Sequence, residues 1–372
     1  MFFLIFFAIY FLGNVYIIYR VVSDLKLHGL SFAVFLILYL IVAFLSVFAL
    51  NIARSNEPSV STKLLAKTGY IWLGVFSITI TFFLLSNILF IFNHTAHFRF
   101  NTTLITIFLI AVSSTYSVFN TCGVPKITEI LIPVNNLPVE KLSIVHLSDI
   151  HIDTATDYND IKKIVEITNS LNPDIIAFTG DLADIDITQN YKNYGLADFK
   201  AKYGVFAVNG NHEYYRGIKN FETVCKKANY ILLDNTNALV DDKFYVAGIT
   251  DIQTSKYFNY KKADVKKALT GVDQTKPIIF LSHQPQIFSE VQKYPVTIQL
   301  SGHTHAGQIP PFDIIELFIY KYFCGLYKEV KEKYTSYIYV TTGTRWWGPP
   351  MRLFSKSEIV HITLINNKNS RL

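Results

Sequence analysis

The chain is poor in cysteine and in charge. Its 372 residues include three cysteines, and Lys, Arg, Asp and Glu together make up 17% of the sequence. The cysteines lie far apart and form no CxxC pair, so they predict neither a disulfide framework nor a zinc finger, and they favour a reducing compartment. The net charge of +6 comes from basic residues spread along the chain. Because no basic stripe is present, we expect no nucleic-acid partner.

Long apolar runs fill the N-terminal third of the chain. The hydrophobic fraction is 51%, and uncharged runs cover residues 2–19, 30–50, 69–92 and 101–121. Each run is close to the length of about 20 residues that crosses a bilayer. No basic residue precedes the first run and no small-residue cleavage site follows it, so we interpret it as a membrane span and not as a signal peptide. The sequence predicts a transmembrane domain of four helices over residues 1–125.

An even number of spans places both ends of the chain on one side of the membrane. Basic residues are slightly more numerous on that side, which holds Arg54, Lys63, Lys67 and Lys126, against Arg20, Lys26 and Arg99 opposite. The positive-inside rule therefore favours a cytoplasmic C-terminal domain in a multi-pass membrane protein. His94 and His97 in the third loop could bind a metal, but histidines at a membrane interface without that role are commoner.

From Lys126 onward, short apolar segments of strand length alternate with amphipathic ones. The apolar segments are 127–134, 142–147, 175–179, 204–208, 244–248, 278–282, 296–301 and 338–342. Residues 158–171 carry apolar side chains at helical spacing. This alternation predicts an α/β domain over residues 126–365, followed by a polar tail at 366–372.

Polar side chains cluster directly after five of these strands. The loops concerned are Asp149-Ile150-His151, Gly180-Asp181, Gly210-Asn211-His212-Glu213, Ser282-His283 and Gly302-His303-Thr304-His305. Each loop alone could be an ordinary turn. Together they contain five of the ten histidines in the chain. Because ligands of α/β sheets bind at the carboxyl ends of the strands, the five loops predict one shared site.

A pair of divalent metal ions suits this set of side chains. Imidazole nitrogens combined with carboxylate and amide oxygens favour first-row metals. Asp181 could bridge two ions with its two oxygens, and the glycines before Asp181, Asn211 and His303 would allow a tight turn or a close approach. Two ions roughly 3.5 to 4 Å apart can lower the pKa of a water between them and stabilise a reacting phosphate.

The order of these motifs, DxH, GDxxD, GNHE, H and GHTH, resembles that of the calcineurin-like metallophosphoesterases. SDIH, GNHEYY, GHTHAGQ and TGTxxWGPPMR are similar, more narrowly, to the membrane-associated YkuE/YaeI-type branch of that family. The likeness covers about residues 126–364. It implies a four-layer (αββα) sandwich, here preceded by an all-α transmembrane bundle.

The resemblance also implies roles for individual residues. One metal would be held by Asp149, His151, Asp181 and His305, and the other by Asp181, Asn211, His283 and His303. His212 would protonate the leaving oxygen, and Asp184 would orient the His212 ring unless it is a solvated loop acid. Glu213 could orient the His212 ring, contact the substrate or face water. The cofactors implied are two divalent ions, manganese ahead of iron, zinc or magnesium.

The chain departs from the family at Arg345, where a glycine is more usual. An arginine at the mouth of the site could donate two parallel hydrogen bonds from its planar guanidinium to phosphate oxygens. It could equally be a surface residue stacked on Trp346. Arg345, Trp346 and Glu213 are therefore our candidates for substrate binding.

A patch rich in Ile, Leu, Phe and Tyr at residues 312–327 follows the GHTHAGQ loop. The lysines on or after it are Lys321, Lys328, Lys331 and Lys333. This composition fits an amphipathic element on the membrane surface, or one that packs against the sheet or the spanning helices. The short distance in sequence between the spans and Asp149 predicts a site near the bilayer.

Our leading hypothesis is a membrane-anchored phosphoester hydrolase in which a metal-bridged hydroxide attacks phosphorus. A tethered enzyme suits a lipid or envelope precursor, and a UDP-2,3-diacylglucosamine pyrophosphatase is the sharpest example. One alternative is a phosphodiesterase for soluble nucleotides that is anchored only for location. Another is a non-catalytic membrane protein that binds a phosphorylated ligand.

Overall fold

The computed structural model describes residues 2–53 and 59–367, in two compact units. The first unit extends to Cys122 and also includes residues 308–314 and 348–354. The second unit contains residues 123–307, 315–347 and the C-terminal strand. Arg54 and residues 368–372 of the predicted polar tail lie outside the described ranges.

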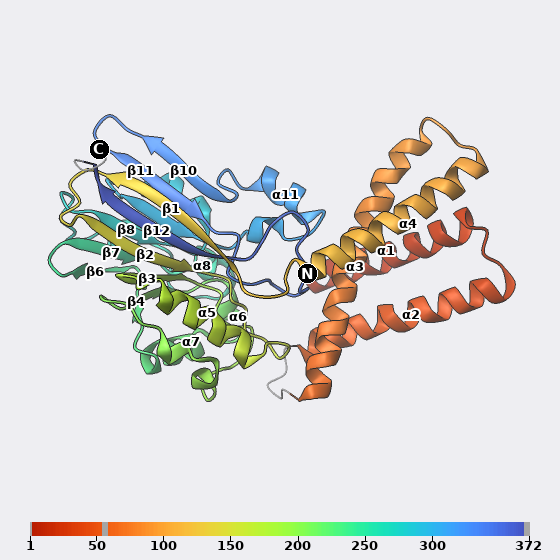
Figure 1. Cartoon of the computed structure of the whole chain (residues 1–372), viewed down its shortest axis with the longest axis horizontal. Coiled ribbons are helices and arrows are strands. Elements are labelled where there is room, and N and C mark those ends of the chain that lie inside the picture. The colour runs from red at the N-terminus through yellow and green to blue at the C-terminus, as the bar shows by residue number, and fades with distance from the viewer. Residues whose placement is uncertain (1, 54–58, 368–372) are drawn as a thin grey trace. The chain divides into compact units, whose positions relative to one another are not determined.

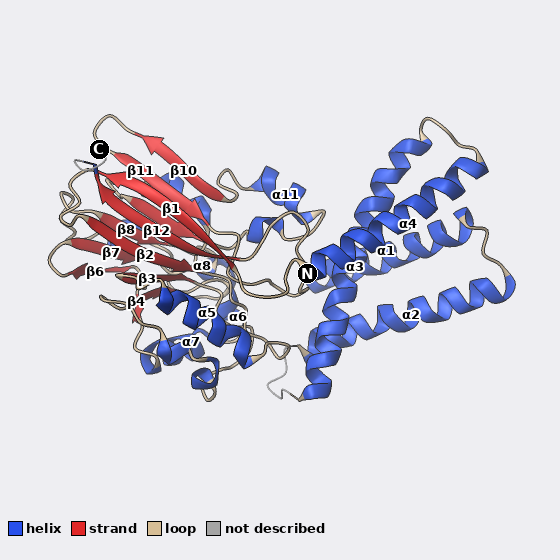
Figure 2. Cartoon of the chain, viewed as in Figure 1, coloured by secondary structure: helices blue, strands red, loops and turns tan. Residues whose placement is uncertain are grey.

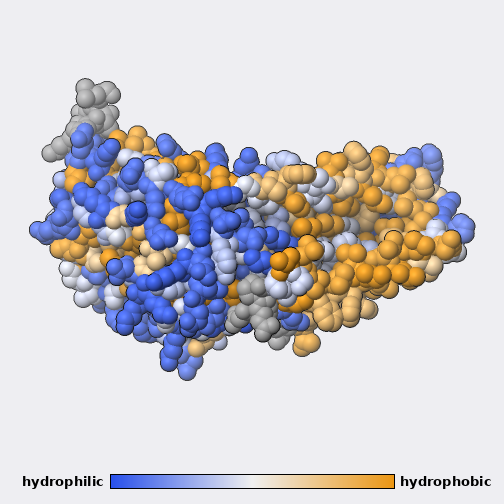
Figure 3. All heavy atoms as spheres, turned by 60° about the horizontal axis from the view of Figure 1, so that its bottom comes forward, coloured by the Kyte–Doolittle hydropathy of each residue, from blue (hydrophilic) through white to orange (hydrophobic). Residues whose placement is uncertain are grey.

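The helices of the first unit are α1 (Phe2–Asp24), α2 (Gly29–Ile52), α3 (Val60–Phe90) and α4 (Ala96–Phe119) (Figure 1). All four are long and apolar enough to cross a membrane. Their outward side chains are mostly hydrophobic, and the face of the helices seen in Figure 3 is largely orange, with hydrophilic residues at its far end. The four predicted apolar helices are thus confirmed. Helix α3 begins well before the uncharged run at 69–92, because the Ser59 side chain caps its first turn.

The interior of the bundle is close-packed and partly polar. Gly69 of α3 lies directly against Ala49 and Ser46 of α2, a contact between small residues that brings the two backbones together. At the end of the bundle where α1 ends, Asp24 accepts hydrogen bonds from Arg20 Nε and Arg99 Nε, each at 2.9 Å. The buried charge of Arg20 is therefore paired, as a low-dielectric interior requires.

Two short segments from the C-terminal half of the chain belong to this first unit. Ile309 and Met351 are buried in the same apolar cluster as Ile78 of α3. The Ser77 hydroxyl donates to the Pro310 carbonyl at 2.6 Å, and the Thr121 hydroxyl donates to the Pro350 carbonyl at 2.8 Å. The N-terminal helices thus pack with one segment that follows the His303–His305 loop and another that follows Arg345 and Trp346.

The second unit contains two six-stranded sheets (Figure 2). The first has the order β1 (Lys126–Val134), β12 (Glu358–Asn366), β2 (Lys141–Leu147), β3 (Ile175–Thr179), β4 (Val205–Val208), β5 (Ile231–Leu232). The second has the order β10 (Gly325–Val330), β11 (Thr335–Val340), β9 (Ile298–Ser301), β8 (Ile278–Leu281), β7 (Phe244–Gly248), β6 (Thr236–Val240). Strands β2, β3 and β4 run parallel, as do β7, β8 and β9.

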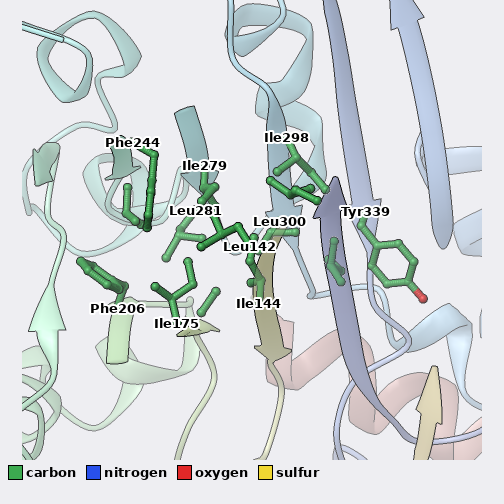
Figure 4. Packing of buried hydrophobic residues seen from close by; sticks show 14 of the residues in the cluster. Leu142, Ile144, Ile175, Phe206, Phe244, Ile279, Leu281, Ile298, Leu300 and Tyr339 are labelled. Carbon is green, nitrogen blue, oxygen red and sulfur yellow. The ribbon is translucent and has the colours of Figure 1, made fainter. Parts of the chain in front are cut away.

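The sheets pack face to face, with helices on their outer faces. Leu142 and Ile175 of the first sheet share a core with Ile279, Leu281 and Ile298 of the second (Figure 4). The outer face of the first sheet packs on α5 (Tyr158–Ser170) and α7 (Ile218–Lys227), and that of the second on α9 (Val265–Ala268) and α10 (Phe288–Val291). This arrangement confirms the predicted four-layer α/β sandwich.

Candidate metal centre

The five polar loops meet at the carboxyl ends of β2, β3, β4, β8 and β9. Backbone hydrogen bonds join them to one another: Asp149 N donates to Gly180 O and His151 N donates to Asp181 O, both at 3.0 Å. Gly302 N donates to His283 O at 2.9 Å. Parallel strands therefore bring residues that are far apart in sequence to one edge, as the motif spacing predicts.

Three residues from this edge form a first group of possible metal ligands. Donor atoms of Asp149, His151 and His305 all lie within 4.8 Å of one another. His305 Nε2 lies 3.3 Å from Asp149 Oδ1 and 3.1 Å from His151 Nε2. His151 Nε2 is also 3.6 Å from an oxygen of Asp181, so Asp181 adjoins this group.

Asp181, His283 and His303 form a second group. His283 Nε2 lies 3.2 Å from Asp181 Oδ2 and 3.1 Å from His303 Nδ1. The Asn211 side-chain oxygen is 3.2 Å from the same His283 nitrogen. Asp181 thus lies between the two groups, where a bridging carboxylate would have to be.

The donor set fits first-row divalent ions. Within each group two imidazole nitrogens face one another at 3.1 Å, beside carboxylate oxygens. Such converging lone pairs repel unless a proton or a cation lies between them. Mixed nitrogen and oxygen donors are the ligands that manganese, iron and zinc accept. The motif resemblance implies divalent metal ions, and these residues could hold them.

Electrostatics at this edge favour the binding of positive charge. Burial alone would raise the pKa of Asp181, but the imidazoles of His283, His212 and His151 hold it well below its usual range. Burial and the adjacent His283 lower the pKa of His303 to about 3, so its imidazole is neutral and one ring nitrogen carries a lone pair. The charged carboxylate and the neutral imidazole are the states that ligate a metal.

The backbone at the candidate ligands is strained. Positive φ angles between 48° and 75° occur at Asp149, His151, Asp181, His303 and His305. Such angles are uncommon for residues other than glycine and cost of order 1–3 kcal/mol each. They persist only where surrounding structure enforces them, and they direct consecutive side chains toward one place.

Gly302 precedes His303, and Gly210 precedes Asn211. Both must be glycine because a carboxylate lies directly against the backbone. A Cβ atom on Gly302 would overlap the Asp149 carboxylate, and one on Gly210 would overlap the Asp181 carboxylate. Neither glycine has a positive φ angle, so turn geometry is not the reason for it. Glycine is needed here because the loop backbone passes directly over a ligand carboxylate.

His212 lies beside the two groups and faces Asp184. Its Nδ1 is 2.6 Å from Asp184 Oδ1, and its Nε2 is 4.0 Å from Asp181 Oδ2. Burial alone would lower the pKa of His212, but Asp181 and Asp184 together raise it to about 9. The same Asp184 oxygen is 3.3 Å from His151 Nδ1, so one carboxylate contacts both rings.

Glu213 is buried and faces the backbone. Its carboxylate accepts hydrogen bonds from the N–H groups of Asp181, Leu182 and Gly210 at 2.9, 2.7 and 2.6 Å. It therefore joins the Gly-Asp loop to the Gly-Asn loop. Of the alternatives that the sequence left open for this residue, these contacts favour a positioning role.

Arg345 is also buried, with 5% of its surface exposed. Its Nη1 donates at 3.1 Å to the Ile150 carbonyl, between Asp149 and His151, and at 3.1 Å to the Thr156 hydroxyl. The guanidinium lies 4.4 Å from the centre of the Trp346 ring, on which it stacks. Arg345 thus holds the backbone of the Asp-x-His loop.

Three aromatic residues beside the site were not predicted from the sequence. The ring centres of Tyr215 and Trp347 lie 5.1 and 5.7 Å from that of His212, and the ring centre of Tyr320 lies 5.8 Å from that of His303. Trp347 adjoins Trp346, and sequence alone does not distinguish which of the two faces the site. Tyr215 lies three residues after His212 on one short helix, α6 (His212–Tyr215), a spacing that could have suggested the contact.

Comparisons with known proteins agree with this geometry. Residues 142–307 match the family model described as calcineurin-like phosphoesterase. The chain is 34% identical to a transmembrane protein with metallophosphoesterase domain of Danio rerio, over 71% of this chain and 63% of that protein. It is 33% identical to an uncharacterized metallophosphoesterase of Campylobacter jejuni, over 73% of this chain and 70% of that one.

YkuE of Bacillus subtilis, an uncharacterized metallophosphoesterase, is 28% identical over 59% of this chain and 78% of its own. The chain spans less than two thirds of the length of the vertebrate relatives, at 63% of the fish protein and 60% of the one from Bos taurus. Together with the four apolar helices, these relatives indicate a membrane protein. The fold, the clustered metal-binding side chains and the extent of the matches establish that this chain belongs to the calcineurin-like metallophosphoesterase family.

Proposed function

We propose that the chain is a membrane-anchored phosphoester hydrolase that works with two divalent metal ions. The observation that carries the proposal is the position of Asp181, which adjoins both ligand groups while His212 lies 4.0 Å from the same carboxylate. A purely structural metal site needs neither two adjoining groups nor an ionisable side chain directed at them. Phosphoester hydrolysis uses both.

Asp149, His151, Asp181 and His305 would hold one ion, and Asp181, Asn211, His283 and His303 the other. When bound, two such ions activate a water and neutralise charge that develops on phosphoryl oxygens. The mixed donor set makes manganese our first choice, ahead of iron, zinc and magnesium. Glu213 and Arg345 would keep the ligand loops in place.

His212 would act as the proton donor. Hydrogen bonding of Nδ1 to Asp184 fixes the ring, which leaves Nε2 directed toward Asp181 and the reacting group. A histidine with a raised pKa is protonated at neutral pH, so Nε2 could give a proton to the leaving oxygen. Tyr215 and Trp347 would flank that oxygen's substituent.

The substrate that we propose is a lipid-linked phosphate or pyrophosphate, such as a UDP-2,3-diacylglucosamine-type compound. Four helices able to cross a bilayer keep the enzyme at a membrane, which benefits a substrate that is confined there. We further propose that all four helices cross it and that the phosphoesterase unit is cytoplasmic. Lys63 and Lys67, at the start of α3, and Lys126, which follows α4 in the chain, would then be on the cytoplasmic side, as the positive-inside rule favours.

The test uses the full chain, purified in detergent and supplied with Mn²⁺ and a model phosphodiester. The double variant Asp181→Ala with His303→Ala should lose turnover and bound metal, since it removes ligands from both groups. His212→Asn should keep about two ions per chain while turnover falls by about 10² to 10⁴. Unchanged turnover in the double variant would overturn the proposal, and the absence of turnover in the wild type would favour a ligand-binding protein.

A second candidate, hydrolysis of a soluble nucleotide, is favoured by the rings of Tyr215 and Trp347 beside His212. Aromatic side chains stack on planar bases at about 1–3 kcal/mol per base. Turnover of the wild-type chain in vesicles should be higher for a lipid pyrophosphate than for a dinucleotide. The reverse order, together with a raised KM for the dinucleotide in Trp347→Ala, would favour the second candidate.

A further inference from the structure

We infer that helix α11 (Phe312–Ile319) inserts into the surface of the bilayer and presents the metal centre to lipid. Residues 312–327 suggest such an element by composition, but composition alone equally allows packing against the protein. The contacts of α11 and of its two ends distinguish these alternatives. The part of the inference that concerns substrate rests on the proposed function, whereas the part that concerns lipid contact does not.

Helix α11 has no buried residue. Its large apolar side chains are between 44% and 84% exposed, and they are Phe312, Ile314, Ile315, Leu317, Phe318 and Ile319. A polar surface helix would bury one apolar face and expose a charged one. The two acidic residues of the helix, Asp313 and Glu316, lie on one face and are half-buried, whereas the remaining faces expose apolar side chains that no described part of the chain covers. Water is an unfavourable neighbour for those side chains.

The neighbour that we assign to α11 is the lipid bilayer. The helix begins in the segment 308–314, which belongs to the first unit, and Ile309 of that segment is buried in the core of this unit. The four helices of the same unit expose apolar side chains that require surrounding lipid. A helix that continues directly from this unit, with exposed apolar side chains on all but the face of Asp313 and Glu316, is therefore suited to the same solvent.

The lysines of the sequence patch do not all accompany α11. Lys321 follows the helix directly, but Lys331 and Lys333 lie beyond the far end of β10, about 20 Å along an extended strand. Lys321 also pairs with Glu329 at 3.3 Å. Membrane contact by α11 would thus depend on apolar burial more than on attraction to anionic headgroups.

The chain segment that carries α11 leaves the ligand loop after His305 and contacts the same loop again after the helix. The Thr304 hydroxyl, between the two histidines of the GHTH motif, donates to the Phe323 carbonyl at 2.8 Å. The Tyr320 ring, one residue after the helix, lies edge-on to His303 with ring centres 5.8 Å apart. Residues 304–323 therefore form a closed loop with the metal centre at its base and α11 within it.

This connection indicates a class of substrate. A phosphate at headgroup depth could reach the ligands while its acyl chains stay in the lipid beside α11. A soluble phosphoester would gain nothing from the helix. We therefore expect α11 to raise turnover only of phosphoesters that are embedded in a bilayer.

The first experiment measures lipid contact without reference to catalysis. A nitroxide is attached at Phe318→Cys in full chains whose Cys122 and Cys324 are replaced by Ser, in phosphatidylcholine/phosphatidylglycerol nanodiscs. Its relaxation should respond more to oxygen than to a water-soluble nickel chelate, and a label at the exposed Lys163→Cys of α5 should show the reverse. Equal exposure of both labels to the chelate would overturn the inference, as would a Phe318 label that neither reagent reaches.

The second experiment tests whether α11 affects turnover of a membrane-embedded substrate without affecting the catalytic step. The double variant Leu317→Ser with Phe318→Ser should lower turnover of a vesicle-embedded phosphoester by about tenfold or more, because two apolar anchors are lost. Its turnover of a soluble model phosphodiester should stay at the wild-type level. The control is Leu239→Ser, which changes a 45% exposed leucine on β6 at the opposite edge of the second sheet and should alter neither rate.

The outcomes also distinguish failure of this inference from failure of the proposed function. If the double variant hydrolyses both substrates at the wild-type rate, α11 has no role at the membrane, while the hydrolase assignment stands. If the wild-type chain hydrolyses neither substrate, the proposed function fails, whatever the nitroxide shows about lipid contact.

Discussion

Asp184 contacts both the proposed proton donor, His212, and a candidate metal ligand, His151. A single carboxylate oxygen lies 2.6 Å from His212 Nδ1 and 3.3 Å from His151 Nδ1. It can thus orient the proposed proton donor and a candidate ligand at once. The consequence is that a change of the Asp184 side chain would remove a contact from both rings at once.

Arg345 offers a test of positioning against substrate binding. Arg345→Met removes the hydrogen bonds to Ile150 and Thr156, so we expect the free energy of unfolding to fall by about 1–3 kcal/mol and the affinity for Mn²⁺ to weaken. The KM for a model phosphodiester at saturating Mn²⁺ should not change. Thermal unfolding, metal titration and steady-state kinetics check this. A raised KM with unchanged unfolding would instead place the guanidinium on substrate.

At the scale of elements, the candidate ligands are carried by loops that cross closely at one sheet edge. The loop after β9 passes over the Asp149 carboxylate of the loop after β2, and this is possible only because residue 302 has no side chain. The two sheets are therefore coupled at the site by direct backbone contact as well as by the shared core.

Gly302→Ala tests this coupling. The added methyl group would overlap Asp149, so we expect loss of bound Mn²⁺ and of turnover, with a lower unfolding temperature. The matched control is Gly271→Asn. A Cβ atom at Gly271 would meet nothing within 4 Å. The backbone there is left-handed, a conformation that asparagine tolerates. Metal content should be lost in the first variant and kept in the second; equal metal content in both would contradict the explanation.

For the whole molecule, the chain order does not follow the division into units. Segments 308–314 and 348–354 come from the C-terminal half but belong to the unit of the N-terminal helices. Each directly follows residues of the candidate site, after His305 in one case and after Trp347 in the other. Removal of the N-terminal helices would thus leave segments 308–314 and 348–354 without the side chains on which they pack. Both segments are continuous with residues of the candidate site.

A chain truncated to begin at Lys126 should therefore be poorly soluble. It would expose Ile309 and Met351, which are buried in the full chain, at a cost of about 1.5–3 kcal/mol each. We expect aggregation without detergent in size-exclusion chromatography. Ile309→Ser with Met351→Ser in the truncated chain should restore a monomer; an already monomeric truncated chain would show that these segments need no partner.

The sequence by itself determined the four apolar helices, the alternation of the sandwich and the set of candidate ligands. These follow from local composition and from polar residues at strand ends, which the chain displays directly. Strands β5, β6 and β10 were not predicted, because these edge strands are short or partly exposed and lack a continuous apolar run. Strand β12 was not predicted either, although it lies inside the first sheet, because His361 and Thr363 interrupt its apolar run.

Only the tertiary structure decided where Glu213, Arg345 and Trp347 point and which unit holds Ile309 and Met351. Each of these depends on contacts between residues far apart in the chain, such as the bond from Arg345 to Ile150. Trp346 is occupied by the Arg345 guanidinium, whereas Trp347 lies beside His212, and the path of the loop backbone decides which of the two rings faces the site. Local pattern specifies which chemistry is present, whereas packing specifies which groups meet.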